Sequence, residues 1–464
     1  MSSLADLTRV VRTEAARTPP DGWVRGSRYD DAKMPEGRVL TRRDLDEVAP
    51  DVPVFVLQVA GHWGVANSRA LELGGIDDDS EPPSGGDYGR DGSGRLNGVL
   101  YEQALFDFAY PSVSRRAGTV VPASTEEDRL IGLRRAVERW HAAGLTSICD
   151  ALVGPADLRL FQTARERGLL TLRTGMLISA EHYGLVSELV SDLGSDPDSN
   201  LGSDPGYGHG SGAEWLRFVG VKTFVDGAIG GRTCLLAEPA DGVRGIQTTT
   251  TAELGEIVRT VHGDGNRICV HANGDRAIRI LLDQLEKAYQ DGPGPRHRIE
   301  HCSLVDDEIL RRMRTIGAIA VPFGSYVHYH GGRLLDWYGP ERVSRMFAHR
   351  SLLDAGITVA GSSDYPCGPY EPLLALQSTV TRRGFDGAEV APEQRITAGE
   401  ALALYTTGAA TATGEDDVKG RLAPGYLADF VVLADDPLTC APERIADIAV
   451  LATYVGGAPV HVRG

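Results

Sequence analysis

The sequence lacks the features that mark secreted, membrane-bound or nucleic-acid-binding proteins. Its six cysteines form no Cys-x-x-Cys pair and no Cys/His cluster, which predicts free thiols, several of them buried, and excludes a zinc knuckle. Basic residues are outnumbered, 47 Lys and Arg against 64 Asp and Glu, and no basic run occurs, so neither nucleic acid nor an anionic membrane is an expected partner. No apolar run is long enough to span a bilayer, and Met1 leads into a charged helical pattern. With Met1 as the true start, we expect a cytoplasmic protein.

Several common enzyme motifs are also absent. No Gly-x-Gly-x-x-Gly motif joins a strand to a helix, no Walker loop occurs, and no Gly-x-Ser-x-Gly elbow is found. The composition, 42% hydrophobic and 24% charged, is nevertheless that of an ordinary globular enzyme. These absences argue against nucleotide-cofactor enzymes and serine hydrolases.

From Thr125 onward the sequence contains a regular alternation of helical patterns and short apolar runs. We expect strands at residues 145–149, 170–178, 216–224, 267–271, 297–301, 318–323 and 357–361, and helices that include 126–143, 155–167, 181–193 and 398–411. Such alternation predicts an α/β fold with a parallel sheet, and the number of units favours a closed (β/α)8 barrel of the TIM type. A strand at 52–59 precedes these units, and residues 76–98 and 194–213 predict loops. Turn-bounded runs at 420–433 and 449–455 predict a small β unit.

Four of these apolar runs lead into residues that can bind a metal or move a proton. His271 and His301 lie 30 residues apart (301 minus 271), which is the length of one β/α unit, so the two imidazoles are expected side by side. Asp364 follows the last strand, either as a turn or cap residue or as an oxygen ligand and general base. Lys222 ends another run, either as a salt-bridged ammonium or, after reaction with carbon dioxide, as a carbamate ligand.

Other polar residues are candidates for lining a substrate pocket. His62 follows Gly61 after the early strand, and Asp226 lies shortly after Lys222. Arg276 lies in the first turn of the helix expected after His271. His328 and His330 form the only His-x-His in the chain, in a context that favours a pocket or the surface over metal ligation. Each of these residues also has an ordinary structural interpretation.

Taken together, these motifs resemble the amidohydrolase superfamily, and within it the YtcJ-like metal-dependent hydrolases, which include N-substituted formamide deformylases. The similarity covers nearly the whole chain. The stretches that carry it are 23–26, 45–50, 61–71, 222–227, 271–277, 298–301, 361–366 and 420–433.

The resemblance implies a metal-bearing barrel that hydrolyses C–N bonds, other than peptide bonds, in amide-like or formamide-like small molecules. It implies a divalent metal, with zinc the expected ion, held by Lys222, His271, His301 and Asp364, and Asp364 as the catalytic proton carrier. It also implies an inserted segment at 1–120, the barrel at 121–412 and a small β-sandwich segment at 413–464. A homo-oligomer is compatible with it.

One part of the family pattern has no counterpart in this sequence. The first barrel strand of these hydrolases ends in a His-x-His motif, whereas no histidine lies between Met1 and Gly22, and the strand at 52–59 matches an inserted segment. We therefore expect a barrel without its first strand. Three explanations stay open: a true start upstream of Met1, a degenerate homologue or fragment without catalysis, or a single metal held by His271, His301 and Asp364. A deaminase on the same scaffold is a further alternative.

Overall fold

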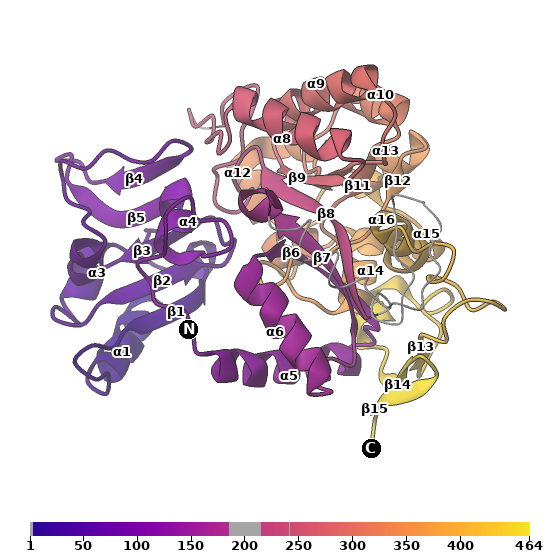
Figure 1. Cartoon of the computed structure of the whole chain (residues 1–464), viewed down its shortest axis with the longest axis horizontal. Coiled ribbons are helices and arrows are strands. Elements are labelled where there is room, and N and C mark those ends of the chain that lie inside the picture. Colours follow the sequence, from indigo (N-terminus) through magenta and orange to yellow (C-terminus); the bar gives the residue numbers. More distant parts are fainter. Residues whose placement is uncertain (1–2, 185–214, 241) are drawn as a thin grey trace.

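A computed structural model of the chain describes residues 3–184, 215–240 and 242–464. The first part is a mixed sheet of β1 (Val24–Tyr29), β2 (Val54–Gln58), β3 (Trp63–Ala66), β4 (Gly86–Arg90) and β5 (Leu96–Glu102), in the order β1-β2-β3-β5-β4. The helices of this N-terminal unit are α1 (Leu4–Ala15), α2 (Arg42–Asp46), α3 (Ser68–Leu73) and α4 (Gln103–Ala109). Figure 1 shows the unit in indigo and purple beside the larger part of the molecule.

Alternating side chains of β2 build two small cores, one on each face of this sheet. Val54 and Val56 pack with the apolar face of α1, whereas Phe55 packs with α3 and α4. This is the period-2 alternation of a strand that is covered on both faces. The sheet therefore has an apolar core of its own on each face.

The prediction of a loop at 76–98 is wrong for residues 86–90 and 96–98, where β4 and β5 pair as an antiparallel hairpin. The chain reverses between Asp91 and Arg95, and Gly94 adopts a positive φ of 84° in the turn. β4 lies at the edge of the sheet with mostly uncovered side chains, so its sequence carries no apolar alternation.

The described residues of the larger part form a parallel sheet of seven strands in chain order, β6 to β12. These are β6 (Ser147–Val153), β7 (Arg173–Ser179), β8 (Leu216–Phe224), β9 (Ile268–Ala272), β10 (Arg298–His301), β11 (Ile319–Val321) and β12 (Thr358–Val359). This sheet confirms the parallel α/β arrangement and fits a TIM-like fold. The closed eight-stranded barrel and its first strand stay predictions.

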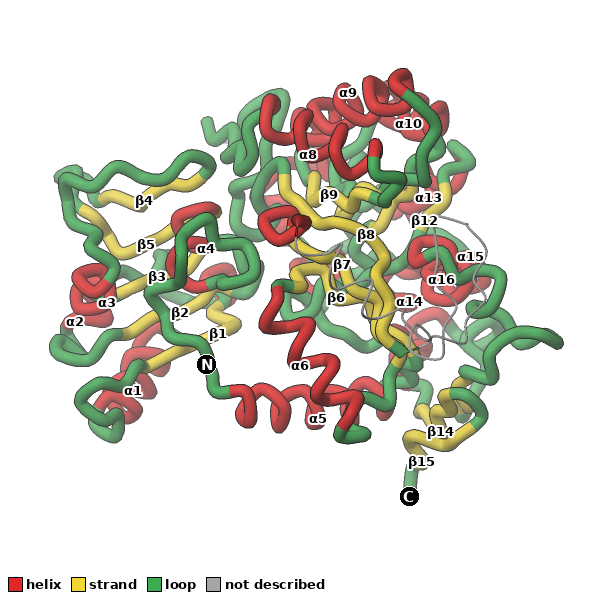
Figure 2. Tube along the Cα trace, in the orientation of Figure 1, coloured by secondary structure: helices red, strands yellow, loops and turns green. Residues whose placement is uncertain are grey.

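Helices cover the outer side of this sheet (Figure 2). The α-helices described in this part of the chain are α5 (Glu126–Ala142), α6 (Pro155–Glu166), α8 (Thr251–Gly263), α9 (Asp275–Asp291), α10 (Asp307–Ile316), α11 (Tyr326–His330), α12 (Arg333–Val343), α13 (His349–Asp354), α14 (Pro372–Thr381), α15 (Ala398–Ala403) and α16 (Ala409–Thr413). The main apolar core lies between α8, α9, α10 and strands β8 to β12. The predicted helix at 181–193 falls mostly outside the described residues.

The helix predicted at 398–411 is confirmed: α15, a π-helical turn at Leu404–Gly408 and α16 follow one another without a break. A Cβ on Gly408 would lie 2.3 Å from the carbonyl oxygen of Val359, so only glycine allows this close approach to β12.

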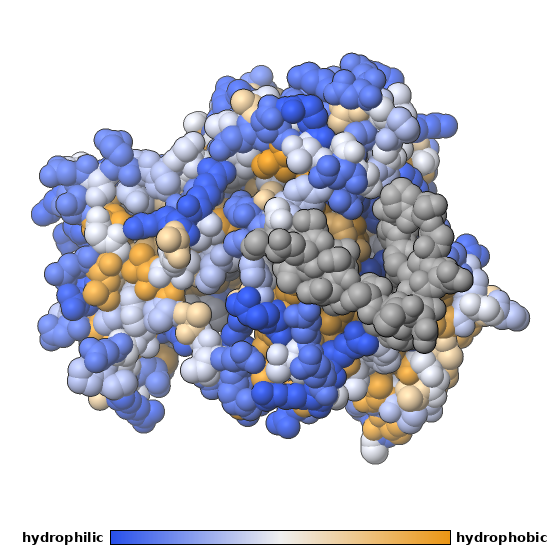
Figure 3. Space-filling view, in the orientation of Figure 1, coloured by the Kyte–Doolittle hydropathy of each residue, from blue (hydrophilic) through white to orange (hydrophobic). Residues whose placement is uncertain are grey.

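The chain ends in a small antiparallel sheet of β13 (Phe430–Leu433), β14 (Val450–Val455) and β15 (Ala458–Val462). A buried ion pair joins it to β7, with Arg173 Nε 2.6 Å from an oxygen of Asp429. Figure 3 shows apolar surface over these strands, to which Val462 contributes with 63% exposure. A second sheet that would complete a sandwich stays a prediction, as do the three domain boundaries. Among the described residues, no helix combines the length and the apolar character needed to cross a membrane.

Candidate active site

Two histidines meet at the carboxyl end of the parallel sheet. His271 lies in β9 and His301 ends β10, and their ring centres are 4.5 Å apart. His301 stacks on Phe323 with ring centres 4.4 Å apart and has a positive φ of 68°. The spacing of one β/α unit thus places the two imidazoles side by side, at the edge where barrel enzymes carry their chemistry.

Both imidazoles are buried, which disfavours their charged form. Burial, reinforced by neighbouring cations, lowers the pKa of His271 and of His301 well below the ordinary value. The Nε2 atom of His271 lies 3.1 Å from the carbonyl oxygen of Gly227 and 3.0 Å from the side-chain nitrogen of Asn273. The Nδ1 atom of His301 has no hydrogen-bond partner among the described residues.

Lys222 reaches the same region from β8. Its side chain is buried, and its Nζ lies 4.6 Å from the ring centre of Phe224. Burial lowers the pKa of Lys222, while the carboxylates of Glu300 and Asp364 act in the opposite direction. Glu300 is already held by Arg298 through two contacts of 2.7 and 2.9 Å. Among the described residues, no carboxylate forms a salt bridge with the buried amine of Lys222, and Glu300 and Asp364 act on it only at longer range.

Asp364 follows β12 in a turn and has a positive φ of 47°. Burial raises the pKa of Asp364, whereas Lys222 and His62 lower it. The adjacent Cys367 donates a hydrogen bond to the carbonyl of Ala60 in the N-terminal unit, with Sγ and oxygen 3.2 Å apart. The turn that carries Asp364 is thus fixed between the two parts of the molecule.

The N-terminal unit contributes His62 to this site, paired with a residue that the sequence analysis missed. His62 Nδ1 lies 2.7 Å from Oε2 of Glu102, and the His62 ring centre is 4.7 Å from that of His271. Burial alone would lower the pKa of His62, but the Glu102 carboxylate more than offsets this and raises it. Glu102 ends the apolar run of β5, which is the same pattern that identified His271. The predicted loop at 76–98 included the first residues of β5, so this strand and the residue that ends it were not predicted.

The other four pocket candidates lie in different surroundings. Asp226 is fully buried, and its carboxylate accepts hydrogen bonds from the backbone nitrogens of Leu235, Asn273 and Gly274, which favours a structural role. Arg276 is exposed on α9. His330 is buried against Tyr326, with ring centres 4.2 Å apart, and His328 is half-buried on the same short helix. Substrate contact by these residues stays a prediction.

The predicted metal ligands do not form a metal centre in this arrangement. Across residues 3–184, 215–240 and 242–464, no three His, Cys, Asp or Glu side chains are grouped so that they could hold an ion. His271 and His301 are adjacent, but the Nε2 atom of His271 is occupied by its contacts with Gly227 and Asn273. The residues as placed do not fit the metal, and its ligation by Lys222, His271, His301 and Asp364 stays a prediction.

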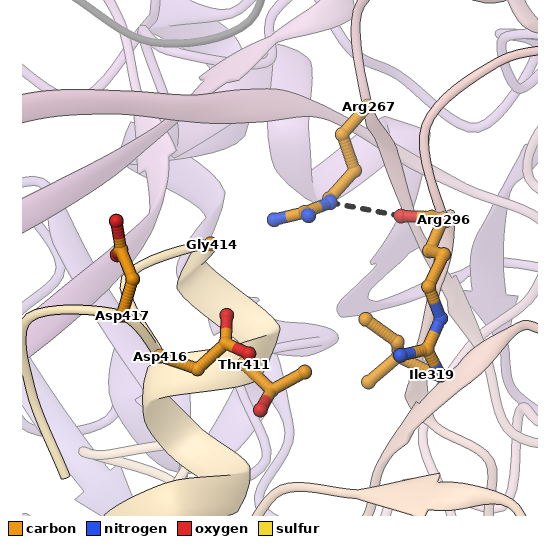
Figure 4. A pocket seen from close by; sticks show the side chains of 7 residues that line it. All are labelled: Arg267, Arg296, Ile319, Thr411, Gly414, Asp416 and Asp417. Atoms are coloured by element: carbon orange, nitrogen blue, oxygen red, sulfur yellow. Dashed lines mark hydrogen bonds between the residues drawn. The ribbon is translucent and has the colours of Figure 1, made fainter.

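A hollow of about 330 Å³ lies at the opposite end of the strands (Figure 4). It is lined by Arg267 and Arg296, which precede β9 and β10, and by residues after α16. Arg267 donates from Nε to the carbonyl of Arg296, with the two atoms 2.8 Å apart. Because the amino ends of barrel strands usually contribute to stability, we do not expect this hollow to be the active site.

Comparison with known proteins identifies the family of the chain. The model of the amidohydrolase family, Amidohydro_3, matches residues 1–461. N-substituted formamide deformylase of Arthrobacter pascens is 30% identical over 98% of this chain and 82% of its own length. The amidohydrolase YtcJ of Bacillus subtilis (strain 168) is 27% identical over 99% of this chain and 84% of its own length.

A solved structure shares the fold over most of both chains. The crystal structure of an uncharacterized metal-dependent hydrolase from Pyrococcus horikoshii OT3 has a TM-score of 0.69 and 25% sequence identity, and the match covers 95% of this chain and 82% of that one. Together with the family match over nearly every residue, this places the chain without ambiguity: it belongs to the amidohydrolase family.

Proposed function

We propose that the chain hydrolyses a C–N bond, other than a peptide bond, in an amide-like or formamide-like small molecule. The observation that carries the proposal is the convergence of Lys222, His271, His301, Asp364 and His62 at one end of the sheet, in a chain similar over nearly its full length to a formamide deformylase. Residues from two parts of the molecule meet there, as they do in sites that enclose a small substrate.

In this proposal Asp364 moves the proton. Its carboxylate takes a proton from water as the water oxygen attacks the carbonyl carbon, and it returns the proton to nitrogen as the C–N bond breaks. The products from a formamide are formic acid and an amine. His62 and the buried rings around it orient the amide, and the apolar walls exclude bulk water.

The proposal includes a divalent metal, because the similar protein from Pyrococcus horikoshii OT3 is described as a metal-dependent hydrolase. The proposal also specifies how the metal is bound: its ligands are Lys222, His271, His301 and Asp364, Lys222 carries a carbamate, and the ion is zinc. No step is assigned to the metal, because the side chains as placed do not form a centre for it.

The test is formate release from formanilide by the purified protein, as prepared and after addition of zinc or manganese, with metal content measured on the same samples. The proposal expects formate release that is lost on replacing Asp364. Absence of formate release under every metal condition, from a protein shown to be folded, would contradict it.

A second candidate is a family member that binds its ligand without catalysis. The observation that favours it is the lack, among the described residues, of a group of three potential metal ligands. It predicts binding of formanilide with neither formate release nor stoichiometric metal. Measurable turnover by the wild-type protein would eliminate it.

A further inference from the structure

The His62–Glu102 pair is built into the backbone of the N-terminal sheet. His62 directly precedes β3, and Glu102 ends β5, where Trp63 pairs with Tyr101. The backbone nitrogen of Glu102 donates to the carbonyl of His62 over 2.9 Å, next to the side-chain contact of 2.7 Å. The two side chains are therefore held on neighbouring strands by main-chain hydrogen bonds as well as by their own.

The carboxylate of Glu102 is fully buried and has one oxygen to spare. Its Oε1 has no partner among the described residues, and Glu102 itself has a positive φ of 49°. A Cβ on Gly227 would lie 2.1 Å from this oxygen, so the glycine is needed where the loop after β8 passes it. A buried, strained carboxylate that is committed to one imidazole suggests a functional reason for the arrangement.

His62 faces the candidate site with its remaining nitrogen. Its Nδ1 is engaged by Glu102, and Nε2 makes no hydrogen bond to the described residues. The ring lies between aromatic neighbours, with centres 6.0 Å from Phe106, 6.1 Å from Phe224 and 4.7 Å from His271. A neutral imidazole that donates from Nδ1 is an acceptor at Nε2.

We propose that Glu102 is a positioning residue that keeps the proton on Nδ1 of His62, and that Nε2 of His62 accepts a hydrogen bond from the amide N–H of the substrate. The substituent on the amide nitrogen then lies against Phe106 and Phe224. This inference rests on the proposed function and narrows its substrate class. It makes the site selective for secondary amides, which carry one N–H, over tertiary amides, which carry none.

Selectivity of this kind follows from what an unmatched acceptor costs. A site that hydrogen-bonds a substrate N–H discriminates strongly against an analogue that lacks it, because the buried acceptor is left without a partner. The Glu102→Leu substitution removes the carboxylate that accepts the proton on Nδ1. Without this acceptor the proton of a neutral His62 is no longer held on Nδ1, and with the proton on Nε2 that nitrogen no longer accepts.

The experiment compares formate release from formanilide, which has an N–H, with release from N-methylformanilide, which has none. Assays are run at alkaline pH, where imidazole is neutral. The ratio of kcat/KM values is measured for the wild type, Glu102→Leu and His62→Phe, so that the intrinsic reactivities of the two compounds cancel. The matched control is His141→Gln, since His141 is a buried histidine with hydrogen bonds from both ring nitrogens, at Leu145 and Thr171, away from this site.

We expect the preference for formanilide to fall about tenfold in both site variants and to stay at the wild-type value in His141→Gln. An unchanged ratio in Glu102→Leu and His62→Phe overturns the proposal. Imidazole nitrogen NMR gives an independent readout, because Glu102→Leu removes the acceptor that holds the proton of His62 on Nδ1 and should shift it toward Nε2. A proton that stays on Nδ1 overturns the role of Glu102.

The same NMR signal separates this inference from the proposed function. If the wild type hydrolyses neither compound, the proposed function fails for this substrate class and binding decides. A shift of the His62 Nε2 signal on addition of formanilide, but not of N-methylformanilide, supports the inference. Equal responses, or none, overturn it.

Discussion

The two ends of the parallel sheet differ in how completely their buried polar groups are hydrogen-bonded. At the carboxyl ends, several buried polar atoms have no hydrogen-bond partner among the described residues, including Ser179 Oγ, His301 Nδ1 and, from the N-terminal unit, Glu102 Oε1. His301 and Asp364 there also have positive φ values of 68° and 47°. At the amino ends, Ile268 donates its backbone N–H to His297 Nδ1, and the His297 Nε2 lies 2.8 Å from Nδ1 of His262.

This difference separates the part of the fold that stores strain from the part that stabilises it. Unsatisfied groups and rare backbone conformations cost free energy and persist where they serve a function. Fully paired groups at the other end offset that cost. The comparison predicts that substitutions at the carboxyl ends change activity more than stability, and that substitutions at the amino ends do the reverse.

The largest expected effect is the loss of activity in Asp364→Asn. Asparagine tolerates a positive φ and has the same shape, but it cannot take a proton from water. We expect kcat/KM for formanilide to fall by at least about 100-fold, with the free energy of unfolding unchanged or raised because a buried carboxylate is removed. The exposed Asp416, beside the hollow at the amino ends, provides the matched control Asp416→Asn. Activity retained in Asp364→Asn would break the comparison.

At the amino ends, His297→Leu should lower stability and leave formate release intact. The substitution removes the partner of the Ile268 N–H and of the His262 Nδ1, and orphaning these buried groups costs roughly 2–4 kcal/mol. Urea unfolding at neutral pH measures the loss.

The pH dependence of the His297 variant gives a second check. Burial lowers the pKa of His297 to about 3, so the unfolded chain binds a proton here below about pH 6.5 and the folded chain does not until about pH 3. Wild-type stability therefore falls as pH decreases through this window, and His297→Leu removes this contribution. An identical slope in the two proteins would contradict it.

Much of this architecture could be predicted from the sequence, because a polar residue after a short apolar run marks the end of a strand. The runs that end near Lys222, His271 and His301 combine β-branched residues with a polar end, and the seven parallel strands follow from that pattern. The adjacency of His271 and His301 follows from one β/α unit of spacing.

Other features could not be predicted, because they depend on contacts between distant segments. Glu102 meets His62 only through the register of β3 and β5, and β4 lies at a sheet edge without an apolar pattern to mark it. The backbone hydrogen bonds that occupy Asp226 come from two separate loops. For the same reason, the sequence listed four metal ligands without showing whether their atoms converge.

The Lys222→Met substitution tests, by its effect on the free energy of unfolding, whether the carboxyl end of the sheet stores strain. Burial lowers the pKa of Lys222, so the unfolded chain holds a proton here at pH values where the folded chain does not, and this penalty increases as pH falls below about 10.5. The variant should gain about 1–3 kcal/mol of stability at neutral pH, gain less at high pH, and lose formate release. A variant that is less stable than the wild type at neutral pH would show that Lys222 is paired rather than strained.

The smallest expected effect, in Thr250→Ala, sets the baseline for both ends. Thr250 caps α8 on the outside of the sheet: its Oγ1 accepts from the backbone nitrogen of Glu253 over 3.2 Å, and Glu253 reciprocates. Losing such a cap costs about 1 kcal/mol and leaves every residue of the candidate site unchanged. Urea unfolding should show this loss with the selectivity between formanilide and N-methylformanilide unaltered. If this variant also loses activity, destabilisation alone reaches the site, and the contrast between the two ends cannot be attributed to local chemistry.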